Sequence, residues 1–200
     1  MKKWLFLLLS VVLSVCVFAE GKSGIGFEFG TVYLMASNDY SGTGTHFTLE
    51  FKLSDDIAFG YFRGESSLSR TSGVAAGSTA PAAVVNLRTV TNSIQVKKSI
   101  LPDLVYLALR IGSYEVSASG IANSVFSQSN PYAGVFVKVV PLKKTTGNFD
   151  GAININLGYN FVLIKAVSDG TTQGGMNNPL NSLLKDVNSF DIGVSVSVTF

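Results

Sequence analysis

The sequence has few charges, one cysteine, one histidine and a single long apolar run. Only 14% of its 200 residues are Asp, Glu, Lys or Arg, whereas soluble domains contain about 25%. With only one long apolar run, the chain does not fit a polytopic helical membrane protein, which needs several runs of about 20 residues. One cysteine excludes a disulfide framework and a cysteine-based metal site. A net charge of +2 without basic clusters argues against a nucleic-acid partner.

Residues 1–19 have the organisation of a secretory signal peptide. Two lysines precede an apolar stretch, residues 4–18, and Ala19 supplies a small residue at the cleavage position. We therefore expect a signal peptide at 1–19 and one domain at 20–200, neutral and free of cysteine. Two alternatives stay open: a retained membrane anchor, or a lipoprotein in which Cys16 is lipidated.

Beyond residue 24 the dominant pattern is apolar alternation with period two. Phe27 and Phe29, for example, flank Glu28. Such alternation predicts strands with one apolar face and one small or polar face. Eight segments show it: 25–35, 45–53, 57–62, 84–98, 105–112, 133–139, 153–161 and 192–200. In the fourth segment the alternation slips between Leu87 and Val90, where we expect a bulge.

The connections between these segments fall into two alternating classes. Those of the first class are rich in Gly, Ser, Asn or Thr, and three of the four are long: 38–43, 71–83, 117–130 and 167–188. Those of the second class are shorter on the whole: 54–56, 100–103 and 141–148. Residues 179–186 have helical spacing and predict a short helix in the last long connection. Long outer loops and tight periplasmic turns are typical of up-and-down barrels in an outer membrane.

The last strand carries the strongest single signal. Apolar side chains occupy every second position and the chain stops on an aromatic residue: Phe190, Ile192, Val194, Val196, Val198 and Phe200. This resembles the C-terminal strand of Gram-negative outer-membrane barrels, in which the terminal Phe and its alternating partners are read by the barrel-assembly machinery. Independently of the resemblance, a closed barrel is the only sheet that satisfies all its backbone polar groups in hydrocarbon.

The whole mature chain resembles the small eight-stranded barrels of the OmpA and OmpX kind in architecture. The resemblance implies an all-β fold, an eight-stranded antiparallel up-and-down transmembrane β-barrel in the outer membrane of a diderm bacterium. It implies outer-membrane lipid and the assembly machinery as partners, no cofactor, and an interior that is filled. Activities in this group are diverse, so the fold alone does not give the function.

The parity of the strands places polar side chains in the lumen. We expect a polar network there made of Glu28, His46, Glu50, Lys52, Arg110 and Lys138. If the first hairpin is centred near Tyr40, Glu28 lies opposite Lys52 as a cross-strand ion pair, with Arg110 in the same layer. Eight strands leave room only for side chains, which favours a plug that satisfies its own charges over a narrow conducting path.

No enzymatic motif is present. The sequence lacks HExxH, GxSxG, P-loop and dinucleotide signatures. His46, Thr48 and Glu50 share a face, but we expect them near the outer rim facing the lumen, where a lipid substrate has no access. Thr is also a poor nucleophile away from an N-terminus. We therefore expect no catalytic, metal or cofactor site.

The expected function is non-enzymatic, with a structural or surface-interaction role. Two alternatives remain: a porin-like narrow pore for small solutes, and a soluble or lipid-anchored periplasmic barrel that binds a ligand as lipocalins do. A lipocalin keeps apolar residues inside, around its ligand. The inward charges Glu50, Lys52 and Arg110 favour the membrane protein, because a ligand cavity would not hold them unpaired.

Overall fold

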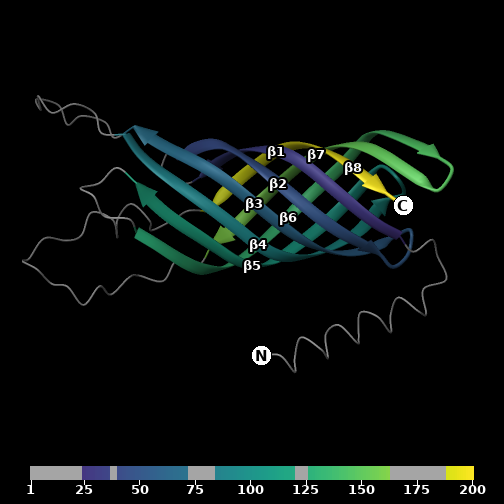
Figure 1. The fold of residues 1–200 in the computed structure, drawn as a ribbon, viewed down its shortest axis with the longest axis horizontal. Helices are drawn as coiled ribbons and strands as arrows, with labels where there is room; N and C mark the ends of the chain where they lie inside the picture. The colour runs from purple at the N-terminus through teal and green to yellow at the C-terminus, as the bar shows by residue number, and fades with distance from the viewer. Residues whose placement is uncertain (1–23, 37–39, 72–83, 120–125, 163–187) are drawn as a thin grey trace, which may run out of the picture.

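Eight antiparallel strands close into one barrel in a computed structural model that describes residues 24–36, 40–71, 84–119, 126–162 and 188–200 (Figure 1). The strands are β1 (Gly24–Ala36), β2 (Ser41–Lys52), β3 (Ile57–Thr71), β4 (Val84–Leu101), β5 (Val105–Ser119), β6 (Phe126–Thr146), β7 (Phe149–Val162) and β8 (Ser189–Thr199). Each strand pairs with the next, and β8 pairs with β1 to close the sheet. The predicted eight-stranded up-and-down barrel is confirmed.

The alternating pattern sorts side chains between the two faces of the wall. Apolar residues face outward, and Phe29, Ile111 and Val196 remain 62%, 72% and 56% exposed. Polar residues face inward, and Glu28 and Asn154 are only 2% and 1% exposed. An apolar exterior around a polar interior is the arrangement of a transmembrane barrel. It is the opposite of the arrangement that the lipocalin-like alternative requires.

The bulge expected in the fourth strand is not where the sequence suggested. β4 pairs with β3 without interruption from Val84 to Lys98, and its irregularity with β5 lies at Ser99 and Leu101. The alternation slips because Leu87 faces the lumen and is 2% exposed. In the sequence, an apolar residue on the inward face interrupts the alternation in the same way as a change of register would.

The predicted turn at 141–148 is also wrong. β6 continues to Thr146, and Gly147, with a φ of 62°, and Asn148 form the turn into β7. The pairing shifts between Val139 and Leu142, so that Pro141, which has no N–H to donate, lies in the irregularity. The resulting two-stranded ribbon extends past the end of the barrel (Figure 1).

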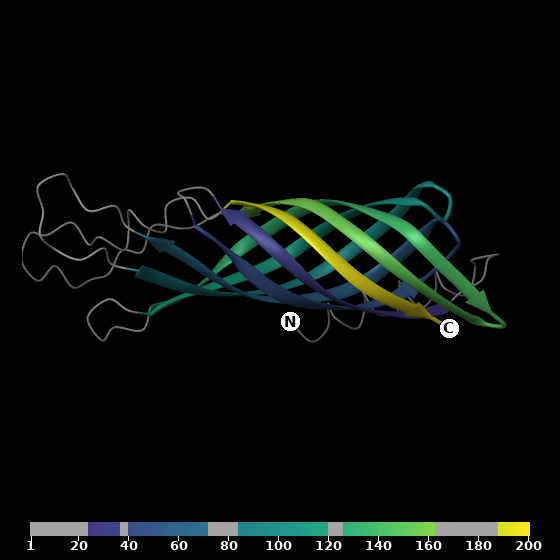
Figure 2. The same ribbon diagram turned by 90° about the horizontal axis from the view of Figure 1, so that it is seen from above.

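At the opposite end, β3, β4, β5 and β6 project beyond the other strands (Figure 2). The predicted loop at 117–130 is too long, because β5 runs to Ser119 and β6 starts at Phe126. The signal peptide and the short helix at 179–186 lie outside the described residues. Among the residues that are described, no helix is long and apolar enough to cross a membrane.

Candidate functional site: the barrel lumen

Two ion pairs between strands that are not neighbours cross the middle of the lumen. Lys138 on β6 donates to Glu28 on β1, and Lys97 on β4 donates to Glu50 on β2. Lys138 Nζ also lies 3.5 Å from Glu50 Oε1, which joins the two pairs. All four side chains are between 2% and 8% exposed. We call these four residues the charged layer.

Glu28 has more partners than any other residue of the charged layer. Its Oε1 accepts a hydrogen bond from Ser195 Oγ at 2.5 Å and one from Asn156 Nδ2 at 3.3 Å. His46 Nε2 lies 3.5 Å from the same oxygen. The carboxylate is therefore held from β2, β6, β7 and β8 at once. A buried carboxylate needs several such partners to offset the loss of its hydration.

A row of stacked planar groups lies across the lumen beside the charged layer. The His46 and Phe62 rings are stacked with centroids 5.5 Å apart. The Arg110 guanidinium lies between the Phe62 and Phe136 rings, 3.6 and 3.8 Å from their centroids. Arg110 Nε donates to Gln95 Oε1 at 2.8 Å. Residues from β2, β3, β5 and β6 thus span the interior, and we call His46, Phe62, Arg110 and Phe136 the transverse stack.

Two glycines on the inward face, Gly30 and Gly158, leave the space that the transverse stack occupies. A Cβ at Gly158 would lie 2.0 Å from the Phe136 ring, and one at Gly30 would lie 2.5 Å from His46 Cε1. Both glycines are on the inward face of their strands, so a side chain at either position would displace the stack. The glycines of the polar face therefore take part in filling the lumen, because they let large rings approach the wall.

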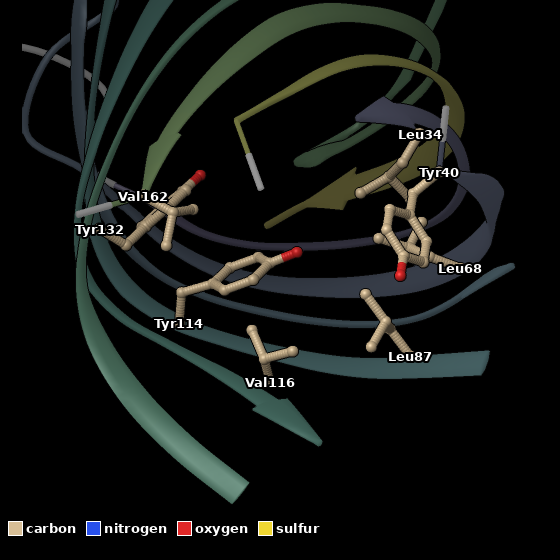
Figure 3. Close-up of a cluster of buried hydrophobic side chains, with 8 residues drawn as sticks. All are labelled: Leu34, Tyr40, Leu68, Leu87, Tyr114, Val116, Tyr132 and Val162. Atoms are coloured by element: carbon tan, nitrogen blue, oxygen red, sulfur yellow. The ribbon is translucent and has the colours of Figure 1, made fainter. Parts of the chain in front are cut away.

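An apolar cluster lies in the lumen towards the end opposite Gly24 and Phe200. Its side chains project inward from the wall and are 1–6% exposed: Leu34, Tyr40, Leu68, Leu87, Tyr114, Val116, Tyr132 and Val162 (Figure 3). A polar bridge borders it, in which Tyr132 Oη donates to Asn160 Oδ1 at 2.6 Å and Asn160 Nδ2 donates to Asp191 Oδ2 at 2.5 Å. The lumen thus contains two consecutive fillings, one polar and one apolar.

The predicted pair between Glu28 and Lys52 does not form. The first hairpin pairs Met35 with Ser41, so Glu28 lies opposite Thr48, and Lys52 lies opposite Gly24 at the end of the barrel. The hairpin is centred two residues earlier than expected, which moves every partner on β2 by four positions. Lys52 is half-buried and separate from the charged layer.

Three of the predicted lumen residues meet in the charged layer, and the others lie elsewhere in the barrel. Glu28, Glu50 and Lys138 meet in the charged layer, whereas Arg110 belongs to the transverse stack and bonds to Gln95. His46 is not near the rim as expected but halfway along β2, opposite Gly30. The alternating apolar residues of the last strand face outward, with Phe190 at 39% and Phe200 at 62% exposure.

Sequence reasoning missed Lys97, Gln95 and Asp191, which are 8%, 1% and 9% exposed. In β4 and β8 the odd residues face inward, whereas the even residues do so in the other strands. The regular alternation of Ile94 and Val96 with Gln95 and Lys97 was a usable signal for β4. The apparent slip in the same strand obscured it.

His46, Thr48 and Glu50, which share one face of their strand, are all buried in the lumen. Thr48 is completely buried, and the carboxylate next to His46 is Glu28, not Glu50. The line of His46, Thr48 and Glu50 therefore does not form a nucleophile and base that a substrate can reach. Within the part of the chain that is described, no group of three or more His, Cys, Asp or Glu could hold a metal ion.

Several solved outer-membrane proteins are similar to this chain in fold. The crystal structure of Ail, the attachment invasion locus protein of Yersinia pestis, is 13% identical, with 90% of this chain and 99% of that chain covered and a TM-score of 0.47. Neisserial surface protein A is 15% identical over 88% of this chain and 95% of that chain, with a TM-score of 0.48. The N-terminal β-barrel domain of Pseudomonas aeruginosa OprF is 14% identical over 90% and 100%, with a TM-score of 0.40. No protein-family model and no curated protein matches the sequence.

Proposed function

We propose that the chain is a non-enzymatic outer-membrane barrel that acts through its surface and does not conduct solutes. The filled lumen is the observation that carries this proposal. The charged layer, the transverse stack and the apolar cluster lie one after another along the interior, and most of their side chains are under 10% exposed. An eight-stranded barrel has little interior space beyond its side chains.

The outer wall supports the membrane placement. Large apolar side chains face outward on all eight strands, from Ile25 on β1 to Val196 on β8. A soluble monomer rarely exposes a continuous apolar patch of that extent. In this proposal the 1–19 segment directs export, lipid covers the wall, and the assembly machinery recognises the last strand.

A polar stretch of outer wall on the long strands supports the surface role. Beyond Tyr61, the outward residues of β3 and β4 form contacts with each other: Tyr61 Oη donates to Asn92 Oδ1 at 2.7 Å, and Arg88 Nε donates to Glu65 Oε1 at 2.7 Å. Tyr61 and Arg88 are exposed, and Glu65 and Asn92 are half-buried. A charged wall beyond the apolar band suits contact with water, lipid head groups or another protein better than contact with acyl chains.

Cell fractionation with gel mobility tests the placement. The full chain should be recovered in the outer-membrane fraction and migrate differently in unheated and boiled samples, because a folded barrel resists detergent until heated. A matched chain lacking residues 2–19 should stay in the cytoplasm. Recovery of the full chain as a soluble periplasmic protein with one mobility would contradict the proposal.

A further inference from the structure

The lumen opens as a cup at the end where β1 begins and β8 ends. The cup is small, with an interior volume of about 50 Å³. Its floor is the charged layer, represented by Glu50, Lys97 and Lys138. Small side chains such as Ala58 and Ala152 are part of its wall.

All lysines of the cup except one are engaged by carboxylates. Lys97 is paired with Glu50, and Lys138 with Glu28. Lys143 at the rim lies 2.6 Å from Asp103 Oδ1 and 3.5 Å from Asp150 Oδ2. The hydrogen bond to Asp103 raises the pKa of Lys143. The lysine therefore stays protonated and paired with these carboxylates.

Lys52 is the exception. It lines the cup and is half-buried, but its Nζ forms no hydrogen bond or ion pair with any described residue, nor with the C-terminal carboxylate. The pKa of Asp150 is lowered first by a hydrogen bond from Thr145 and then by the charge of Lys143, and the charge of Lys52 contributes less than either. A half-buried ammonium group has lost part of its hydration, and an anion would restore the lost interactions.

Further hydrogen-bond donors line the same recess. Ser197 and Thr199 of β8 and the phenol of Tyr106 contribute hydroxyl groups to the lining. Glu50, Asp55, Asp56 and Asp150 line it too, and their charge opposes entry of a dianion such as phosphate. One ammonium group with several hydroxyls therefore fits a single carboxylate better than a phosphate.

We propose that the cup binds the carboxylate of a small acid or of a peptide chain end, with Lys52 as its charge partner. The proposal depends on the proposed function only for the compartment, since the end with the chain termini would face the periplasm. The carboxylate enters from that end, its oxygens meet Lys52 and the hydroxyl lining, and the charged layer stops it from passing further.

The test uses the full barrel refolded in detergent micelles and isothermal titration with four probes: acetate, inorganic phosphate, a tripeptide with a free C-terminus and the same tripeptide amidated. Acetate or the free tripeptide should bind more tightly than phosphate and the amidated tripeptide. Binding of acetate alone identifies small acids as the source, and binding of the tripeptide identifies chain ends.

Two variants make the result specific. Lys52→Gln should weaken carboxylate binding by about tenfold or more, as expected for loss of a charge-assisted hydrogen bond. Lys144→Gln is the matched control, because Lys144 is exposed and does not line the cup. Both variants should keep the heat-dependent gel mobility of the wild type, which separates loss of binding from loss of folding. The proposal is overturned if neither carboxylate binds, if Lys52→Gln binds as the wild type does, or if Lys144→Gln loses as much affinity.

Discussion

Glu28 on β1 and Lys138 on β6 form a buried ion pair across the lumen, 110 positions apart in the chain. The two strands share no backbone pairing, since β1 pairs only with β2 and β8. The pair can therefore exist only when the barrel is closed. It links the first strand to the second half of the sheet, next to the β1–β8 junction.

Removing either partner of this pair should be costly. Glu28→Gln leaves Lys138 buried with part of its charge unpaired, and we expect a loss of about 3–5 kcal/mol in the free energy of unfolding. The double variant Glu28→Gln with Lys138→Gln should lose less than the sum of the single variants. Urea titration of the barrel in micelles measures both.

The exposed pair of Glu65 and Arg88 provides the control for that experiment. Its side chains are 44% and 63% exposed, so Glu65→Gln should cost no more than about 1 kcal/mol. Equal losses for the buried and the exposed pair would show that burial does not determine the importance of these charges.

The transverse stack predicts a strong effect of a single methyl group. Gly158→Ala places a Cβ 2.0 Å from the Phe136 ring, whereas Gly151→Ala meets no atom closer than 3.7 Å. We expect the first substitution to cost about 1–3 kcal/mol through overpacking and the second to cost little. Adding Phe136→Leu to Gly158→Ala should recover part of the stability, and a failure to recover would mean that the ring is not the obstacle.

A charge on the outer wall should destabilise the folded barrel in lipid. Ile155 faces outward at 39% exposure, and Ile155→Arg should cost roughly 2–4 kcal/mol if the site lies near the bilayer midplane. Ala152→Ser, on the inward face of the same strand, is the matched control. Asn156→Ser is unsuitable, although parity alone suggests it, because Asn156 donates to Glu28 and Ser195. Equal tolerance of both changes would contradict the assignment of faces.

The last residue is expected to matter for assembly. Phe200 N donates to Ile25 O at 3.0 Å, and the Phe200 ring packs edge-on against Phe149 and Phe27 at centroid distances of 5.4 and 6.4 Å. A chain ending at Thr199 should be exported but poorly assembled, whereas Phe200→Trp should retain assembly. Normal amounts of folded protein in the outer membrane without Phe200 would remove this role.

The sequence alone predicted the fold better than the contacts inside it. Alternation with period two identifies the two faces of a strand, because a strand has only two. It does not identify register, and an error of two residues in the first hairpin gave Glu28 the wrong partner. Leu87 was misleading because hydropathy does not distinguish an apolar residue facing lipid from one packed inside. The transverse stack could not be predicted, since its members come from four strands whose relative heights depend on the stagger of the closed barrel.

Single-channel recording in planar bilayers tests the central claim, the closed lumen, most directly. The wild-type barrel should give no steady conductance. Lys138→Ala should remain closed although it disrupts the charged layer, because the apolar cluster around Leu68, Leu87 and Tyr114 still fills the next section of the lumen. Lys52→Ala should also have no effect, since Lys52 lies outside the charged layer. Steady, frequent channels from the wild-type protein would contradict the account and favour the pore.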